Sequence, residues 1–337
     1  MAINTTEFEL KAQCEEWIAL KGGIALNNSD MRKYVPESYK EIWASSLNNP
    51  LRIYSEEIQE IFESTAINLG IFEKRPSLST ISFLRRLCEK DDSDNILDSL
   101  AVLVECMGIE RKEIMEPEGK KIYTLKKYFD SQSYKSLSTI EKASVFDFIE
   151  LLDFRTTNGI WSDTKIYTDI IELEDLFTQY ETIAPDGHFF DQRFIKYLNK
   201  QFEDIDNIHW RKFEELTAEF FLKHGYEVEL GNGTKDGGID IRVWSDAKDP
   251  NTLRIVQCKR WKNPVNIEYV KALAYDVVDH NAQGGFIVTT NSIAPGAEQL
   301  TAVRNRQVIG VERDNLNKWL KIMRAPDLGS FVGSFKK

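Results

Sequence analysis

Apolar residues switch between two spacings from about residue 206 to residue 323, and this pattern constrains the fold more than any other feature of the sequence. Spacings of three and four residues predict helices at 210–224, 267–280, from 294, and at 314–323. Short apolar runs predict strands at 226–230, 239–244, 253–258, 285–289 and 308–312. The order is helix, three strands, helix, strand, helix, strand, helix. It predicts an α/β fold in which helices flank both faces of a mixed sheet.

The first 200 residues differ, because most of their apolar positions follow helical spacing alone. One predicted helix runs from Ser138 to Phe154 and opens with a capping box formed by Ser138 and Glu141. Residues 161–177 fit a strand or a helix. We therefore expect three parts, namely a mainly α-helical N-terminal domain at 1–200, the α/β domain at 206–323 and a C-terminal tail at 324–337.

Length and composition agree with this division. A chain of 337 residues suits two domains, because single cores usually stop growing near about 250 residues. Apolar residues make up 42% and charged residues 29% of the chain, as in globular proteins. No signal-peptide pattern or membrane-spanning apolar run is present. The four cysteines form no CxxC pair, so we expect free thiols, no structural zinc, a cytoplasmic location and no membrane partner.

The net charge of −11 lies wholly in the N-terminal region. Residues 1–200 contain 24 basic and 35 acidic side chains, whereas residues 201–337 contain 19 of each. Affinity for nucleic acid comes mainly from Lys and Arg side chains that contact phosphates. The acidic region is therefore not expected to be the main surface that binds a duplex. We expect it to act as a sensor or protein-partner module. Basic clusters such as residues 259–262 can still give the C-terminal region a positive face.

A polar motif begins one predicted strand and ends the next. The segment from Asp236 to Asp240 places two glycines just before a strand, and Gln257 and Lys259 share one face of the following strand because strand side chains alternate. Pairing of the two strands can bring Asp240, Gln257 and Lys259 together. A carboxylate and an amide oxygen suit Mg²⁺, and Lys259 can position or activate a water for in-line attack. This set meets the requirements of phosphodiester hydrolysis.

Several motifs in this order resemble the Mrr-like type IV restriction endonucleases of the PD-(D/E)XK nuclease superfamily. They are Phe213-Glu214, Gly225-Tyr226, Asp236 to Asp240, Gln257-Cys258-Lys259 and Gly285 to Thr290. The resemblance covers residues 206–323, whereas the N-terminal region resembles no family that we can name.

The resemblance implies a role for each matching residue. Asp240 is the metal-binding aspartate, Lys259 is the catalytic lysine, and Gln257 stands where the wider superfamily usually has a metal-binding Glu or Asp. Glu214 is the helix glutamate that reaches the metal through water, with Glu215 as the alternative. The implied activity is Mg²⁺-dependent DNA endonuclease, with Mn²⁺ as a possible substitute. The implied role is restriction and antiviral defence against foreign or modified DNA.

Plainer interpretations remain for each feature. The Asp-Gly-Gly segment alone is typical of a hairpin turn, and an isolated Gln-x-Lys of a solvated strand face. Cys258 is expected to be a core thiol. Trp261 can stack on a base or pack beneath its loop. Thr289 and Thr290 can contact phosphate or cap a helix.

Two other functions also stay open. One is a non-catalytic DNA- or partner-binding protein on a nuclease fold, and the other is a nuclease for branched or single-stranded nucleic acid. Because one site cuts one strand, cleavage of a duplex predicts a homodimer on DNA.

Overall fold

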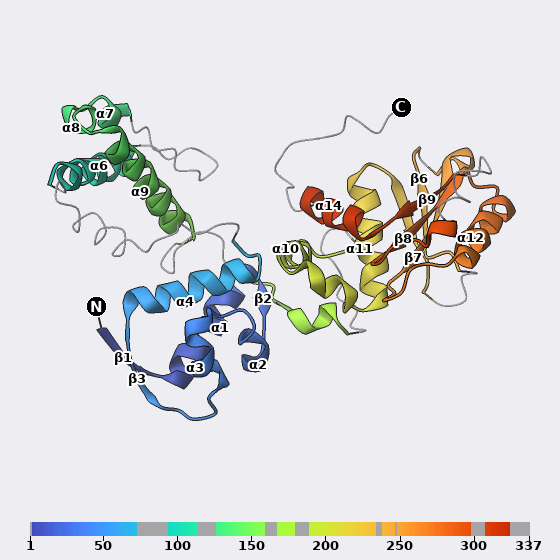
Figure 1. The fold of residues 1–337 in the computed structure, drawn as a ribbon, viewed down its shortest axis with the longest axis horizontal. Coiled ribbons are helices and arrows are strands. Elements are labelled where there is room, and N and C mark those ends of the chain that lie inside the picture. The colour runs from blue at the N-terminus through green and yellow to red at the C-terminus, as the bar shows by residue number, and fades with distance from the viewer. Residues whose placement is uncertain are drawn as a thin grey trace. The chain divides into compact units, whose positions relative to one another are not determined.

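A mixed sheet forms the centre of the C-terminal region (Figure 1). Its strands, in their order across the sheet, are β5 (Glu227–Leu230), β6 (Ile241–Trp244), β7 (Leu253–Lys259), β8 (Gly284–Thr289) and β9 (Gln307–Val311). Strands β5, β6 and β7 are antiparallel, whereas β7, β8 and β9 are parallel. Parallel neighbours need a crossover connection, and a helix supplies it between β7 and β8. Each strand lies within two residues of its predicted position.

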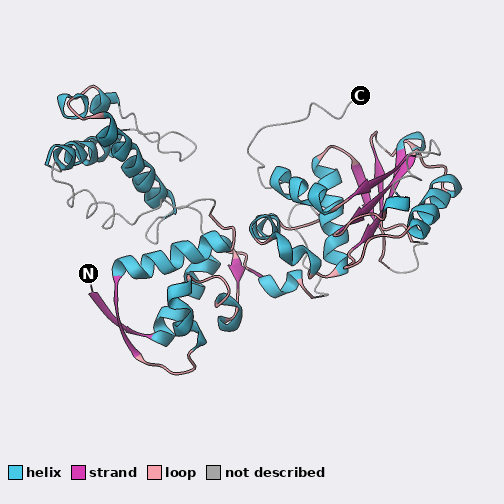
Figure 2. Cartoon of the chain, in the orientation of Figure 1, coloured by secondary structure: helices cyan, strands magenta, loops and turns pink. Residues whose placement is uncertain are grey.

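Helices cover both faces of this sheet, as predicted (Figure 2). They are α11 (Trp210–Lys223) and α14 (Arg313–Met323) on one face and α12 (Ile267–Asp279) on the other. The ring of Phe221 in α11 lies 5.1 Å from that of Phe286 in β8. Across the sheet, a Cβ at Gly285 would come within 3.1 Å of Leu273, so glycine lets α12 lie close to β8.

Helix α11 begins and ends at residues suited to those positions. His209 is the N-cap, and its Nδ1 accepts a 3.2 Å hydrogen bond from the backbone N–H of Arg211. Gly225 follows the helix with a φ of +81°, a left-handed conformation that glycine adopts readily. The chain can therefore turn directly from α11 into β5.

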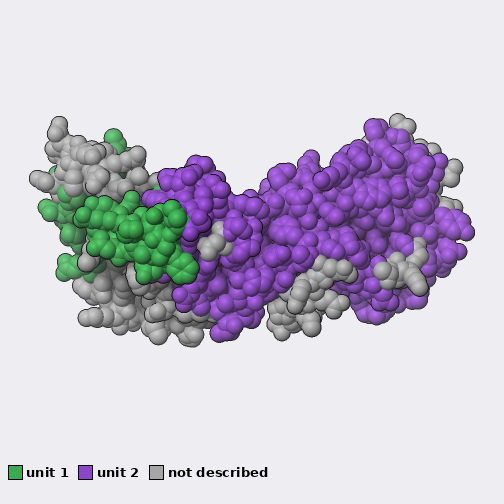
Figure 3. Space-filling view, turned by 90° about the horizontal axis from the view of Figure 1, so that it is seen from below, with its two compact units in different colours: residues 1–10, 47–64, 72–165 green, residues 11–46, 65–71, 166–337 purple. Residues whose placement is uncertain are grey.

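The structure is a computed structural model that describes residues 2–72, 94–113, 126–158, 167–178, 189–233, 238–246, 248–297 and 307–323. It divides into two compact units (Figure 3). Unit 1 comprises residues 1–10, 47–64 and 72–165, and unit 2 comprises residues 11–46, 65–71 and 166–337. The limits predicted from sequence, 1–200 and 206–323, stay predictions, and the tail at 324–337 lies outside the described residues. Within the described ranges, no helix is long and apolar enough to cross a bilayer.

Unit 1 contains a small sheet and a helical cluster. Strand β1 (Ala2–Thr6) pairs antiparallel with β3 (Pro50–Tyr54). The cluster consists of α6 (Asp94–Glu113), α7 (Lys126–Phe129), α8 (Gln132–Lys135) and α9 (Thr139–Asn158). Its buried core is formed by Ile96, Leu100, Leu103, Tyr128, Leu137, Val145 and Phe148.

The predicted capping box is present at the start of α9. The backbone N–H of Ser138 donates to the Glu141 carboxylate at 2.7 Å, and the backbone N–H of Glu141 donates to the Ser138 hydroxyl at 3.4 Å. These bonds satisfy amides that a helix start leaves without partners.

The remaining short elements of unit 2 lie mostly outside the C-terminal sheet domain, and η5 alone lies within it. They are β2 (Ile24–Ala25), α2 (Asn28–Met31), η1 (Glu37–Tyr39), α3 (Lys40–Ala44), β4 (Ile171–Glu172), η2 (Leu173–Leu176), α10 (Gln192–Lys200), η4 (Phe202–Asp206) and η5 (Pro250–Thr252). Helices α1 (Glu7–Gly22) and α4 (Ser55–Asn68) cross the division between the units. Strands β2 and β4 pair in parallel, so part of 161–177 is a strand, while residues 161–166 lie outside the described ranges.

Buried polar contacts tie α10 to the N-terminal residues of unit 2. The hydroxyls of Tyr34 and Tyr197 lie 2.7 Å apart. Arg193 forms a 2.8 Å ion pair with Asp191 and donates to the Gly23 carbonyl at 3.1 Å. Residues distant in sequence therefore share one polar core.

Candidate active site

The carboxylate of Asp240 is fixed against strand β7. Asp240 directly precedes β6, and its backbone N–H donates to the carbonyl of Val256 at 3.0 Å. Its Oδ2 accepts a 2.6 Å hydrogen bond from the backbone N–H of Cys258. Ile241 is paired with Val256 in the antiparallel register of β6 and β7, so the preceding residue, Asp240, lies beside Gln257. The carboxylate thus lies at the point of β7 between Gln257 and Lys259.

Gln257 is a buried side chain with one bonded end and one unbonded end. Its exposed fraction is 6%, and its Nε2 donates to the carbonyl of Gly238 at 2.9 Å. Its Oε1 is buried and, among the described residues, accepts no hydrogen bond. A buried polar atom without a partner costs about 1–3 kcal/mol. Such an atom in a native fold indicates a water or a ligand.

Gly238 sets the orientation of that amide. Its φ is +88°, a conformation that residues with a Cβ rarely adopt, and a Cβ there would lie 3.4 Å from Nε2 of Gln257. Because Nε2 is bonded to the Gly238 carbonyl, Oε1 must point elsewhere. Asp236 and Gly237, the first part of the predicted turn, lie outside the described residues.

The ammonium group of Lys259 lies against two aromatic rings. Its Nζ is 5.4 Å from the ring centroid of Trp261 and 5.6 Å from that of Tyr269 in α12. Lys259 and Gln257 therefore point to the α12 face of the sheet, in agreement with the alternation along β7.

Two threonines at the end of β8 brace the end of β7. The carbonyl of Lys259 accepts hydrogen bonds from the Thr289 hydroxyl at 2.8 Å and from the Thr290 backbone N–H at 3.3 Å. The Thr290 hydroxyl donates to the Trp261 carbonyl at 3.3 Å. The sequence does not predict this role, because the parallel register that sets Thr289 beside Lys259 exists only in the fold.

Glu214 lies on α11, which covers the opposite face of the sheet. It is 6% exposed and forms a 2.8 Å ion pair with Arg211. The adjacent Glu215 instead pairs with Lys212 at 2.9 Å.

The thiol of Cys258 faces α11, where it hydrogen-bonds with Thr217. Burial raises the pKa of this thiol well above its ordinary value, and the charges of Asp240 and Glu214 raise it further. The two carboxylates therefore lie near the same thiol, and the raised pKa makes the partly buried Cys258 a poor nucleophile.

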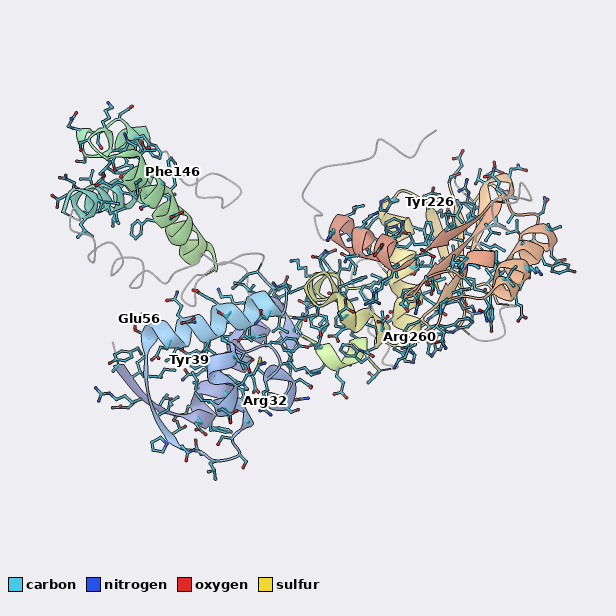
Figure 4. The ribbon with its side chains drawn as sticks, in the orientation of Figure 1. Arg32, Tyr39, Glu56, Phe146, Tyr226 and Arg260 are labelled. Atoms are coloured by element: carbon cyan, nitrogen blue, oxygen red, sulfur yellow. The ribbon has the colours of Figure 1, made fainter. Side chains whose placement is uncertain are left out.

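Arg260, labelled in Figure 4, is directed at protein rather than at solvent. Its Nη1 donates to the backbone carbonyl of Asp206 at 2.7 Å, and Arg313 binds the Asp206 carboxylate at 2.7 Å. The pKa of His209 is lowered by burial and by the charges of Arg260 and Lys212. Part of the basic cluster at 259–262 is thus used to hold η4 to the sheet.

The polar groups at this site fit a hard divalent cation. Among the described residues, no group of three or more His, Cys, Asp or Glu side chains could hold a metal. Mg²⁺ needs few protein ligands, however, because it keeps several of its waters. Two oxygen groups suit such an ion: the buried Oε1 of Gln257, which has no hydrogen-bond partner among the described residues, and the carboxylate of Asp240, which is bonded to the backbone N–H of Cys258.

The structure thus places Asp240, Gln257 and Lys259 at neighbouring strand ends of the mixed sheet. Residues 205–320 match the family model of the Mrr catalytic domain, described as a restriction endonuclease. This part of the chain is therefore an Mrr-type restriction endonuclease domain, as the sequence motifs predict.

Two known proteins share similarity with part of the chain. An uncharacterized protein, y4cE, from Sinorhizobium fredii (strain NBRC 101917 / NGR234) is 27% identical over 114 residues, which are 33% of this chain and 29% of that protein. The structure of MspJI restriction endonuclease in complex with a 27-mer oligonucleotide covers 44% of this chain and 36% of that chain. Its sequence identity is 15% and its TM-score is 0.29. This chain thus spans less than a third of the curated relative.

Proposed function

We propose that the C-terminal domain is an endonuclease that hydrolyses phosphodiester bonds in DNA with Mg²⁺, for which Mn²⁺ can substitute. The observation that carries this proposal is the buried Oε1 of Gln257, which has no hydrogen-bond partner among the described residues. A buried amide oxygen that accepts no hydrogen bond, on a strand whose neighbour carries the Asp240 carboxylate, is suited to bind a metal ion.

Each site residue has a distinct task in this proposal. Asp240 and Gln257 hold the cation through oxygen atoms. When bound, the cation neutralises charge that develops on the scissile phosphate. Lys259 donates hydrogen bonds that orient the attacking water toward the phosphate. Glu214 acts indirectly through a water.

Substitutions at Gln257 test the metal role separately from the structural role. Glu at this position keeps oxygen ligands but cannot donate to the Gly238 carbonyl, whereas Leu loses both. If Gln257 holds the metal, Gln257→Glu cleaves DNA and Gln257→Leu does not. If Gln257 only supports Gly238, both variants fail alike, and the proposal is wrong. Gln283→Leu, an exposed glutamine just before β8, is the matched control.

The assay measures cleavage of plain duplex, modified duplex and single-stranded DNA, with Mg²⁺ and with chelator. Thermal unfolding with and without Mg²⁺ provides a second measurement, because a ligand that binds only the folded state raises Tm. Cleavage that is unaffected by chelator would refute the metal dependence. Faster cleavage of single-stranded DNA than of duplex DNA would support the alternative function, a nuclease for single-stranded nucleic acid.

We further propose that the chain acts in the cytoplasm in defence against foreign or modified DNA, with the N-terminal region as a sensor or partner module. The acidic charge of residues 1–200 supports this division. Lys262 and Lys33 are both exposed. Charge reversal by Lys262→Glu should weaken duplex binding at low salt, whereas Lys33→Glu should not. The opposite result would assign DNA binding to the N-terminal region.

We also propose that two copies act together on a duplex, because each site cuts one strand. Light scattering of the full chain with duplex DNA tests this. A monomer both free and on DNA that still makes clean duplex breaks would contradict it.

A further inference from the structure

The ammonium group of Lys259 lies on one side of a pair of aromatic rings that contact each other. Its Nζ lies 5.4 Å and 5.6 Å from the ring centroids of Trp261 and Tyr269. The two centroids are 4.5 Å apart, with an interplanar angle of 76°. A cation within about 6 Å of an aromatic face is attracted by the ring quadrupole. Both rings are therefore close enough to hold the ammonium group.

The elements that carry the two rings are held by the backbone and the core. The backbone N–H of Trp261 donates to the Lys259 carbonyl at 3.0 Å, and the Trp261 carbonyl is bonded to Thr290. Trp261 also packs against the apolar cluster beneath α12. Tyr269 is placed by its neighbour in α12, Val270, which is 3% exposed in that cluster. The two rings thus come from different elements that pack against the same apolar cluster.

We propose that Trp261 and Tyr269 are positioning residues that hold the Lys259 ammonium by cation–π contact, and we term the pair the aromatic clamp. The inference rests on the proposed function of Lys259. A lysine side chain has many rotamers, and fixing it by contacts made elsewhere in the fold reduces the entropy lost when it engages substrate. Among the described residues, Lys259 has no salt bridge that could do this instead.

The clamp predicts a loss in kcat rather than a rise in KM. A cation–π contact of ordinary strength corresponds to a rate change of about 3- to 30-fold. Trp261→Leu and Tyr269→Leu should each lower kcat within that range and leave KM for duplex DNA unchanged. Trp261→Phe and Tyr269→Phe keep an aromatic face and should recover most of the rate.

A second measurement follows Lys259 directly in the full-length protein. With ¹³C-labelled lysine, ring currents should shift the ε-CH₂ signals of Lys259 upfield of other lysines, and Lys259→Arg assigns the signals by their loss. Trp261→Leu and Tyr269→Leu should move them toward the other lysines. Tyr275→Leu is the matched control, because Tyr275 is 70% exposed on the same helix; it should change neither the signals nor kcat.

The possible outcomes separate the clamp from the proposed function. Shifted signals, a lower kcat and rescue by Phe support the clamp. Unchanged signals in both Leu variants overturn it, whatever their activity. If the Lys259 signals move in the Leu variants but kcat stays full, the proposal is also overturned, because the rings would then hold the lysine without affecting the reaction rate. A higher KM with unchanged kcat would make Trp261 a DNA contact instead. Full activity of Lys259→Ala would refute the proposed function itself, independently of the NMR result.

Discussion

The site on β6 and β7 and the helical cluster α6–α9 bury polar atoms in opposite ways. In the cluster, Ser99 is 0% exposed, and its hydroxyl lies 2.8 Å from the hydroxyl of Tyr128. At the site, Oε1 of Gln257 is buried without a partner among the described residues. Packing therefore pairs the two hydroxyls in the cluster, whereas at the site the described residues leave Oε1 of Gln257 able to accept a hydrogen bond or to bind a ligand.

The two regions also differ in where their stabilising contacts come from. Apolar side chains supply the core of the helical cluster, and volume-conserving apolar substitutions there are usually tolerated. The site instead depends on a left-handed glycine, a buried amide and backbone hydrogen bonds between strands. Substitutions in the two regions should therefore affect different measurements.

The largest expected effect is on cleavage. Asp240→Asn removes the charge that holds a cation but keeps an oxygen that can accept from Cys258 N–H. Cleavage should fall by about two orders of magnitude or more, with little change in Tm measured without metal. Lys259→Ala should cause a similar loss. Full activity in both purified variants would show that Asp240 and Lys259 are not needed for cleavage.

The next effect is on the stability of the helical cluster. Leu103 is 0% exposed, and Leu103→Ala leaves a cavity that should lower the free energy of unfolding of this region by about 2–5 kcal/mol. In calorimetry, only the unfolding transition of the helical cluster should move to a lower temperature. The rise in Tm that Mg²⁺ causes in the C-terminal domain should stay unchanged. If Leu103→Ala abolished the Mg²⁺-induced rise in Tm, the two regions would be coupled.

A smaller effect separates backbone strain from amide orientation. Gly238 and Gly225 have φ angles of +88° and +81°, so Ala at either position introduces strain of about 1–2 kcal/mol. Only Gly238 contacts Gln257; a Cβ at Gly225 would meet nothing within 4 Å. Gly238→Ala should weaken Mg²⁺ binding in calorimetric titration, and Gly225→Ala should not. Equal Mg²⁺ affinities would show that Gly238 does not orient the amide.

The smallest effect concerns acid pH. Hydrogen bonds from the Ser138 side chain and backbone lower the pKa of Glu141. A lowered folded-state pKa means that this stability is present above the ordinary carboxyl pKa and is lost as pH falls through the folded value. The carboxylate is exposed and screened, so the contribution is about 0.5 kcal/mol or less. Glu141→Ala should flatten the acid limb of the pH–stability curve for this region, and an unchanged limb would exclude the capping box as its source.

The sequence predicted the C-terminal elements closely, because hydrophobic spacing and glycines are local signals. Alternation along β7 was enough to place Gln257 and Lys259 on one face. It could not predict the pairing of β1 with β3 or of β2 with β4. Those strands have two to five residues, and the partners are distant in the chain, so local periodicity carries little information about them.

The sequence by itself determined the order of helices and strands in the C-terminal domain and the residue types of the candidate site, since both depend on residue type and short-range spacing. Only the tertiary structure decided how the site groups are directed. The bond from Gln257 to Gly238, the support of Lys259 by Thr289, and the ring of Tyr269 all join residues from different elements. The physical reason is that a side chain's rotamer and hydrogen-bond partners depend on neighbours brought together by packing, which spacing along the chain does not specify.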